Sequence, residues 1–203
     1  MKKLGWFLLG AISLLALQAL AASLVLTRAH GLSAREEPSA IERWIARRAR
    51  DAALPATAKS RANPAPNTPD ILSDARAHWA DHCASCHAND GSGDVALGKH
   101  MYPPAPDMRK SATQNLSDGE LFYIIQNGIR LTGMPAWGSD HDAQDSWKLV
   151  RFIRHLPDLT IEERNQMEKL NPRNPEELKE EEQEEKFLKG ESTDEPQQLH
   201  HHH

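Results

Sequence analysis

The chain opens with a long apolar run that differs from everything after it. Lys2 and Lys3 precede 23 uncharged residues, 4–26. As a helix, that run spans roughly 34 Å, enough to cross the hydrocarbon core of a bilayer. Because positive charges before a span stay cytoplasmic, we expect the rest of the chain to be exported. Residues 1–30 are therefore predicted to be an uncleaved transmembrane signal-anchor; the alternative is a signal peptide cleaved at the A-x-A-like site 19–21.

Residues 31–54 contain a second, amphipathic pattern. Ser39 and Glu42 have the spacing of a capping box at a helix N-terminus. The apolar positions share one face of the predicted helix: Ile41, Trp44, Ile45, Ala49 and Ala52. Of its arginines, Arg43, Arg47 and Arg50 lie elsewhere on the helix. A basic amphipathic helix beside a span either lies on the lipid surface, with Trp44 in the interface, or packs on the soluble domain or a partner subunit.

Two further segments lack the pattern of a folded domain. Residues 55–69 hold four prolines among small and polar residues, which predicts a semi-extended linker. Residues 158–203 are acidic, with five glutamates in the six residues 180–185. They predict a solvated helix or a disordered tail, with a docking surface for a basic partner as the alternative. The final run, His200–His203, is either an expression-tag remnant or a native metal-binding end.

Residues 70–157 are the one segment with domain-like patterning. Three amphipathic stretches predict helices over about 70–86, 117–127 and 143–156. The second begins with a capping box and ends at an Asn-Gly stop. β-Branched residues are scarce, which argues against a barrel or sandwich and predicts an all-α fold. Hydrophobic residues make up only 39% of the chain, so a large core made of protein alone is not expected.

The two cysteines of the chain stand in a single motif, Cys83 to His87, of the form C-x-x-C-H. This is the attachment pattern of c-type haem. The spacing suits the chemistry because two thiols three residues apart can add to the two vinyl groups of a porphyrin. His87, the next residue, then lies under the iron as its proximal ligand.

Other chemistries use a similar cysteine pair. A thioredoxin-like redox pair needs a βαβ context, and no strand-like run lies near Cys83. A zinc site built from these cysteines with His78, His82 and His87 is left open by the local spacing. A multi-bridge disulfide scaffold and a four-cysteine zinc site are excluded by the cysteine count.

A second iron ligand is predicted downstream, at Met134. It lies 47 residues after His87, between Gly133 and Pro135, so its thioether is expected in a loop of fixed backbone. A core methionine is more often found on an amphipathic helix. The weaker candidates for this position are Met101, Met108, His100 and His141.

Taken together, residues 70–157 resemble a class I c-type cytochrome, most closely the monohaem modules of cytochrome c subunits in haem-copper oxidases. The resemblance is carried by the C-x-x-C-H motif, the proline-rich turn 102–107, the stretch 121–128 and the loop 133–137. It implies an all-α fold around one covalent haem c, held by Cys83 and Cys86 with His87 and Met134 on the iron. It also implies that the carbonyl of Pro103 or Pro104 accepts a hydrogen bond from the His87 ring. The first helix departs from the family, because Arg76 and Ala77 stand near where the family often has a glycine. Ala75 or Ala77 then has to allow a close crossing against Trp147 or Phe152.

The function expected from these features is electron transfer. A Met/His pair leaves iron no open position and raises its reduction potential. We therefore expect a membrane-anchored carrier of single electrons between a membrane-linked donor and an acceptor such as a terminal oxidase or reductase. It would work on the periplasmic side of a bacterial inner membrane, with redox proteins as partners and no small-molecule substrate. Residues 70–157 hold 11 acidic and 8 basic side chains, so binding to nucleic acid is not expected. The alternatives are a haem enzyme or sensor with an open iron position, using His100 or His141, and a thiol redox or zinc protein.

Overall fold

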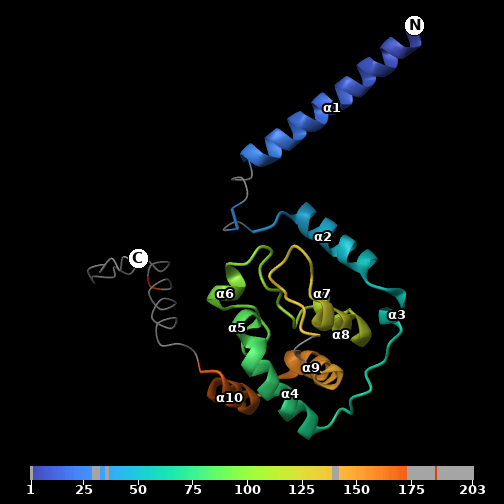
Figure 1. Cartoon of the computed structure of the whole chain (residues 1–203). Coiled ribbons are helices and arrows are strands. Elements are labelled where there is room, and N and C mark those ends of the chain that lie inside the picture. Colours follow the sequence, from blue (N-terminus) through green and yellow to red (C-terminus); the bar gives the residue numbers. More distant parts are fainter. Residues whose placement is uncertain (1, 29–32, 35–36, 139–141, 173–185, 187–203) are drawn as a thin grey trace.

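The computed structural model describes residues 2–28, 33–34, 37–138, 142–172 and 186 (Figure 1). Within these residues the secondary structure is helical and contains no strand, which confirms the predicted all-α class. The helices are α1 Lys2–Arg28, α2 Ala40–Ala53, α3 Ala56–Lys59, α4 Pro69–His82, α5 Ala84–His87, α6 Ala96–Lys99, α7 Ser111–Gln114, α8 Asp118–Asn127, α9 Ala143–His155 and α10 Ile161–Leu170. A short 3₁₀ turn, Leu156–Asp158, joins α9 to the segment before α10.

The N-terminal helix α1 contains the predicted apolar run. Its stretch Lys3–Leu24 has a mean hydropathy of 2.1 and none of it is buried in the protein. Among the described residues, it is the one helix whose length and composition suit a membrane span. The same properties suit an N-terminal signal sequence.

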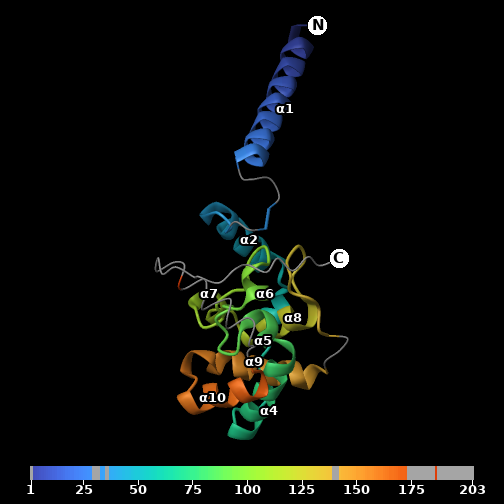
Figure 2. The same ribbon diagram turned by 90° about the vertical axis from the view of Figure 1, so that its left-hand side faces the viewer.

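The core lies where α4 crosses α9. Trp79 of α4 and Phe152 of α9 are buried, and their ring centroids lie 5.5 Å apart. Ala75, one of the two small residues predicted to permit this crossing, is 1% exposed. Helix α8 also packs against α9, where Phe122 of α8 stacks on Trp147 of α9 with ring centroids 4.1 Å apart. Figure 2 shows α4, α9 and α10 gathered at the end of the domain away from α2.

Local capping fixes where these helices begin, as the sequence predicts for α8. Ser117 accepts a hydrogen bond from the Glu120 backbone N–H, and the Glu120 carboxylate accepts one from Ser117 N. Thr68 caps α4, with proline as its first residue. The first predicted helix is divided in the structure, since α4 ends at His82 and the rest forms the single turn α5.

The residues predicted to be a tether, 55–69, instead lie on the domain. Ala58 of α3 is 6% exposed, and Asn63 Nδ2 donates to the Trp147 carbonyl at 2.9 Å. Arg151 Nε donates to the Ala65 carbonyl at 2.8 Å. The part of this segment after α3 is therefore fixed to α9 by hydrogen bonds, one to a backbone carbonyl of α9 and one from the Arg151 side chain. Its partners lie more than 80 residues along the chain, beyond the reach of a local pattern.

The acidic region also begins with a folded part, which moves the end of the domain beyond residue 157. Helix α10 starts with a capping box formed by Thr160 and Glu163. Met167 on its inner face is fully buried, and Arg76 of α4 lies 3.5 Å from the Glu163 carboxylate. The helix is thus part of the domain rather than of a solvated tail. The glutamate run 180–185 and the terminal histidines lie outside the described residues.

Candidate functional site

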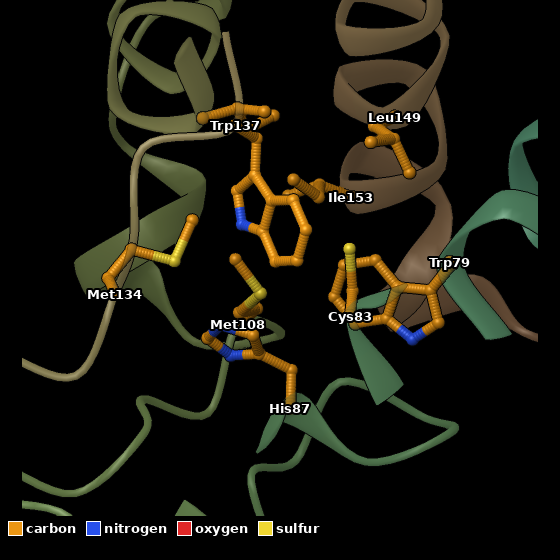
Figure 3. A pocket seen from close by; sticks show the side chains of 9 residues that line it. Trp79, Cys83, His87, Met108, Met134, Trp137, Leu149 and Ile153 are labelled. Carbon is orange, nitrogen blue, oxygen red and sulfur yellow. The ribbon is translucent and has the colours of Figure 1, made fainter. Parts of the chain in front are cut away.

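An apolar cavity lies between α4, α5, α8, α9 and the loop that carries Met134. Figure 3 shows its lining, which comprises Trp79, Cys83, His87, Met108, Ile125, Met134, Trp137, Leu149 and Ile153. Three of the four residues predicted to hold a haem are among them. The fourth, Cys86, is half-buried beside the cavity on the turn of α5.

The single turn of α5 places the cysteine and histidine side chains. His87 N donates to the Cys83 carbonyl at 2.9 Å, so the backbone closes one helical turn between the first cysteine and the histidine. Gly98 of α6 lies against this turn, where an added Cβ would stand 2.2 Å from the Cys86 carbonyl oxygen. Only glycine permits that approach. The indole Nε1 of Trp79 donates to the Ala88 carbonyl at 3.0 Å and fixes the end of the motif.

His87 has an incomplete set of hydrogen bonds. Its Nδ1 is buried and finds no hydrogen-bond partner in the part of the chain that the structure describes. Burial lowers the pKa of His87, because the charged imidazolium loses its hydration. The ring is therefore held neutral, with a nitrogen lone pair available to a metal. The predicted hydrogen bond to Pro103 or Pro104 is not formed here. Pro103 is exposed, and the turn packs through Ala105, whose N–H donates to the Gly98 carbonyl.

The two thiols are free and do not form a disulfide. Burial raises the pKa of Cys83 to about 12, with a smaller contribution from the negative charge that Cys86 acquires. A reactive redox cysteine needs the opposite shift, because the thiolate is the nucleophile. The environment of Cys83 thus differs from that of a thioredoxin-like pair.

The Met134 loop returns to the C-terminal end of α8. Ile129 N donates to the Met134 carbonyl at 3.1 Å, and Met134 N donates to Thr132 Oγ1 at 3.1 Å. Trp137 N then donates to the Ile125 carbonyl at 3.0 Å. Gly128 ends α8 with φ +65° and a Cβ there would lie 2.7 Å from the Met134 carbonyl oxygen. The loop therefore holds the Met134 thioether at the cavity by backbone hydrogen bonds on both sides.

A second thioether, that of Met108, lines the same cavity. It follows the proline-rich turn, and its N–H donates to the Gly91 carbonyl at 2.8 Å. The sequence ranks it below Met134, and the tertiary fold brings both to one place (Figure 3). Met101 is placed differently, since its sulfur packs where a Cβ on Gly133 would stand.

The other candidate ligands are not gathered at the cavity. His100 is exposed at the end of α6, and His141 lies outside the described residues. The rings of His78 and His82, both on α4, lie with their centroids 5.0 Å apart and their planes tilted at 59°. In the described part of the chain, no group of three or more His, Cys, Asp or Glu side chains is placed to hold a metal ion.

Sequence reasoning did not identify the apolar walls of the cavity. Ile125 and Ile153 are identified from the sequence only as core positions of α8 and α9, and Leu149 is not singled out at all. Trp137 belongs to the motif of the Met134 loop, but nothing local indicates that its ring faces inward. Such positions become identifiable only when the helices are packed.

These residues suit the haem that the C-x-x-C-H motif implies. Two free thiols and a neutral imidazole lie on one turn. The buried Nδ1 of His87 has no hydrogen-bond partner among the described residues, so the ring lies in an apolar environment. Met108 and Met134 offer soft sulfur donors on the cavity wall. The remaining lining residues are apolar or aromatic, as a porphyrin face requires.

Comparison with known families gives a match to part of the chain. Residues 70–153 match the family described as cytochrome C oxidase, cbb3-type, subunit III. The match includes the C-x-x-C-H motif and the Met134 loop and leaves α2, α3 and α10 outside. No curated protein matches the chain.

Proposed function

We propose, from the premise that residues 70–153 are a class I c-type cytochrome module of the cbb3-type oxidase subunit III family, that the protein is a membrane-anchored carrier of single electrons. The observation that supports this proposal is that Cys83, His87 and Met134 line one apolar cavity. A covalently bound haem c, which the family implies, supplies a one-electron ferric/ferrous couple.

Each residue of the site has a distinct role in this proposal. Cys83 and Cys86 would form the two thioether bonds, so that one haem stays attached. Neutral His87 would ligate the iron through its imidazole, and the Met134 thioether would supply a second protein ligand. The indole walls, Trp79 and Trp137, would exclude water from the ring. A dry, fully ligated site changes little between two oxidation states, which suits a carrier.

The cavity lining favours electron transfer over substrate chemistry. Activation of peroxide or a similar ligand needs an acid–base group on the distal side of the iron. Apart from His87 and the two-cysteine motif, the residues lining this cavity are apolar, aromatic or methionine. His100, one residue that the sequence offers for such a role, is exposed elsewhere. We therefore assign the protein no catalytic residue and expect it to act alone as a carrier or within an oxidoreductase complex.

The anchoring part of the proposal rests on α1. The stretch Lys3–Leu24 has the length and hydropathy of a membrane span. Lys3 is its first residue and Lys2 precedes it. The positive-inside rule then puts the cytochrome module on the periplasmic side of a bacterial inner membrane. Its donor and acceptor would be redox proteins in or at that membrane, and a terminal oxidase or reductase is the acceptor that a raised potential suits.

Purification of the full chain from membranes tests this function. We expect a c-type α-band that survives denaturation and acid–acetone extraction, because two thioethers retain the haem. The redox titration should fit a one-electron couple. Peroxidase turnover should not exceed that of free haem in the same buffer. Cys83→Ser with Cys86→Ser should release the haem on extraction. A protein without covalent haem, or one that turns over peroxide rapidly, contradicts the proposal.

A further inference from the structure

Helix α2 presents an apolar face formed by Ile41, Trp44 and Ile45. These side chains are 70%, 61% and 53% exposed. No residue of α2 is buried, so the face packs on nothing in the described part of the protein. Large apolar side chains gathered on one side of a helix normally have a partner.

The helix is nevertheless joined to the domain by another of its faces. Tyr102 Oη donates to Glu42 Oε1 at 3.0 Å, which links α2 to the proline-rich turn. Leu54, just after the helix, is 8% exposed, and Ala58 is 6% exposed against α8. The apolar face is therefore turned away from the domain, as its exposure shows, while the helix continues into the packed segment 55–69. Figure 1 shows α2 at one side of the domain, followed by α3.

The charge of α2 suits an anionic surface. The helix carries four arginines against Glu42 and Asp51, a net charge of +2. Arg50 pairs with Asp51 at 2.8 Å. The Arg48 guanidinium lies 5.8 Å from the centre of the Trp44 ring, which sets a cation at the edge of the apolar face. A long arginine side chain beside an interfacial tryptophan is the arrangement in which the charge reaches headgroups while the ring enters the boundary layer.

The position of α2 along the chain brings it close to the bilayer. Eleven residues, 29–39, separate the end of α1 from the first residue of α2. Fully extended, such a segment reaches about 40 Å, and as a flexible coil it averages about 18 Å. A span in α1 thus confines α2 to the vicinity of the surface, where weak interfacial binding is sufficient.

We propose that α2 lies flat on an anionic lipid surface, with Ile41, Trp44 and Ile45 in the boundary between headgroups and acyl chains. This rests on the proposed anchoring by α1. Because α2 runs into the packed segment 55–69, its adsorption sets the orientation of the cytochrome module relative to the bilayer. The module is then held beside the membrane in one orientation rather than swinging on a free tether.

Limited proteolysis of the full, haem-loaded chain in vesicles tests this proposal. The protein is reconstituted into phosphatidylcholine vesicles with or without about one third phosphatidylglycerol. Trypsin cleavage after Arg47 and Arg48 is followed by mass spectrometry, with cleavage after the exposed Arg130 as the internal reference. We expect the anionic vesicles to slow cleavage in α2 about tenfold, without slowing it at Arg130.

Two variants separate adsorption from other causes of protection. Ile41→Ser with Trp44→Ser should be cleaved in anionic vesicles as fast as the parent is in neutral ones. Ile161→Ser removes an isoleucine of α10 that is equally exposed, at 72%, and should keep the protection. Flotation of the vesicles reports the anchoring by α1 independently of α2.

Three results overturn the proposal. If the protein floats with the vesicles but α2 is cleaved equally fast in both lipids, α2 does not adsorb, although α1 still anchors the chain. Protection that is the same in neutral lipid and rises with protein density assigns the apolar face to a second copy of the chain. If the protein does not float with the vesicles, α1 does not anchor it. The proposed adsorption of α2, which rests on that anchoring, is then also wrong.

Discussion

Gly119, in the first turn of α8, lies directly under the packed segment 55–69. An added Cβ would stand 2.0 Å from the Ala58 carbonyl oxygen and 2.7 Å from the Arg61 Cβ. Both distances are far below van der Waals contact, and the closer atom belongs to the backbone. Gly119→Ala therefore requires the segment to move away from α8. The Arg61 guanidinium, 4.6 Å from the centre of the Phe122 ring, moves with it.

The sign of the stability change distinguishes a docked segment from a tether. Alanine is a better helix former than glycine by up to about 1 kcal/mol, so the substitution stabilises a helix whose surface is free. Overpacking in a filled contact destabilises by about 1–3 kcal/mol, and loss of an exposed cation–π contact adds about 0.5–1 kcal/mol. Because these effects exceed the gain in helix propensity, we expect a net loss of about 1–2 kcal/mol.

Thermal unfolding and proteolysis of the holoprotein measure this prediction together. A loss of that size lowers the Tm by about 4 °C or more for a domain of this length. Trypsin cleavage after Lys59 and Arg61 should become faster, while cleavage after Arg130 stays unchanged. A Tm that is equal or higher, with unchanged cleavage at Lys59, would refute the docking of this segment.

Two further predictions concern α10 and the proline-rich turn. Met167→Ala truncates a fully buried side chain and should lower the free energy of unfolding of the holoprotein by about 2–4 kcal/mol in chemical denaturation. Leu170→Ala, at a 48% exposed position, should change it by less than about 0.5 kcal/mol. Equal effects of the two substitutions contradict the inclusion of α10 in the domain. The hydrogen bond from the Arg109 side chain lowers the pKa of Asp107 to about 2, so Asp107 stabilises the fold above its unfolded pKa of about 3.9, and this contribution is lost as pH falls toward 2. Asp107→Asn should therefore cost about 1 kcal/mol at neutral pH, and the difference from the parent in urea titrations should shrink between pH 4 and 2; a difference independent of pH contradicts this assignment.

The sequence was most informative where the determinants are local. The capping box of Ser117 and Glu120 and the stop at Gly128 define α8 correctly, because each depends on residues within one turn. The C-x-x-C-H motif likewise forms a single turn with its own backbone hydrogen bonds. A capping box at Thr160 was equally visible and would have located α10, but the surrounding glutamates favoured a solvated segment.

Features that depend on distant contacts were beyond a local pattern. The docking of residues 55–69 needs Gly119 to leave room and Arg151 to supply hydrogen bonds, and neither is signalled near the prolines. Met108 reaches the cavity only because the turn before it folds back on Gly91. The sequence ranks Met134 above Met108 because of its Gly-Met-Pro loop, yet nothing in the sequence indicates that both methionines line one cavity.

The choice between Met134 and Met108 therefore gives the most direct test of the account. Visible and near-infrared spectra of the oxidised holoprotein should show the long-wavelength charge-transfer band of methionine bound to ferric haem. Met134→Ala should abolish that band, lower the midpoint potential and open the iron to added imidazole. Met108→Ala should retain the band, with at most a small loss of stability. If Met134→Ala keeps the band, or Met108→Ala loses it, the His87–Met134 site proposed for this protein is wrong.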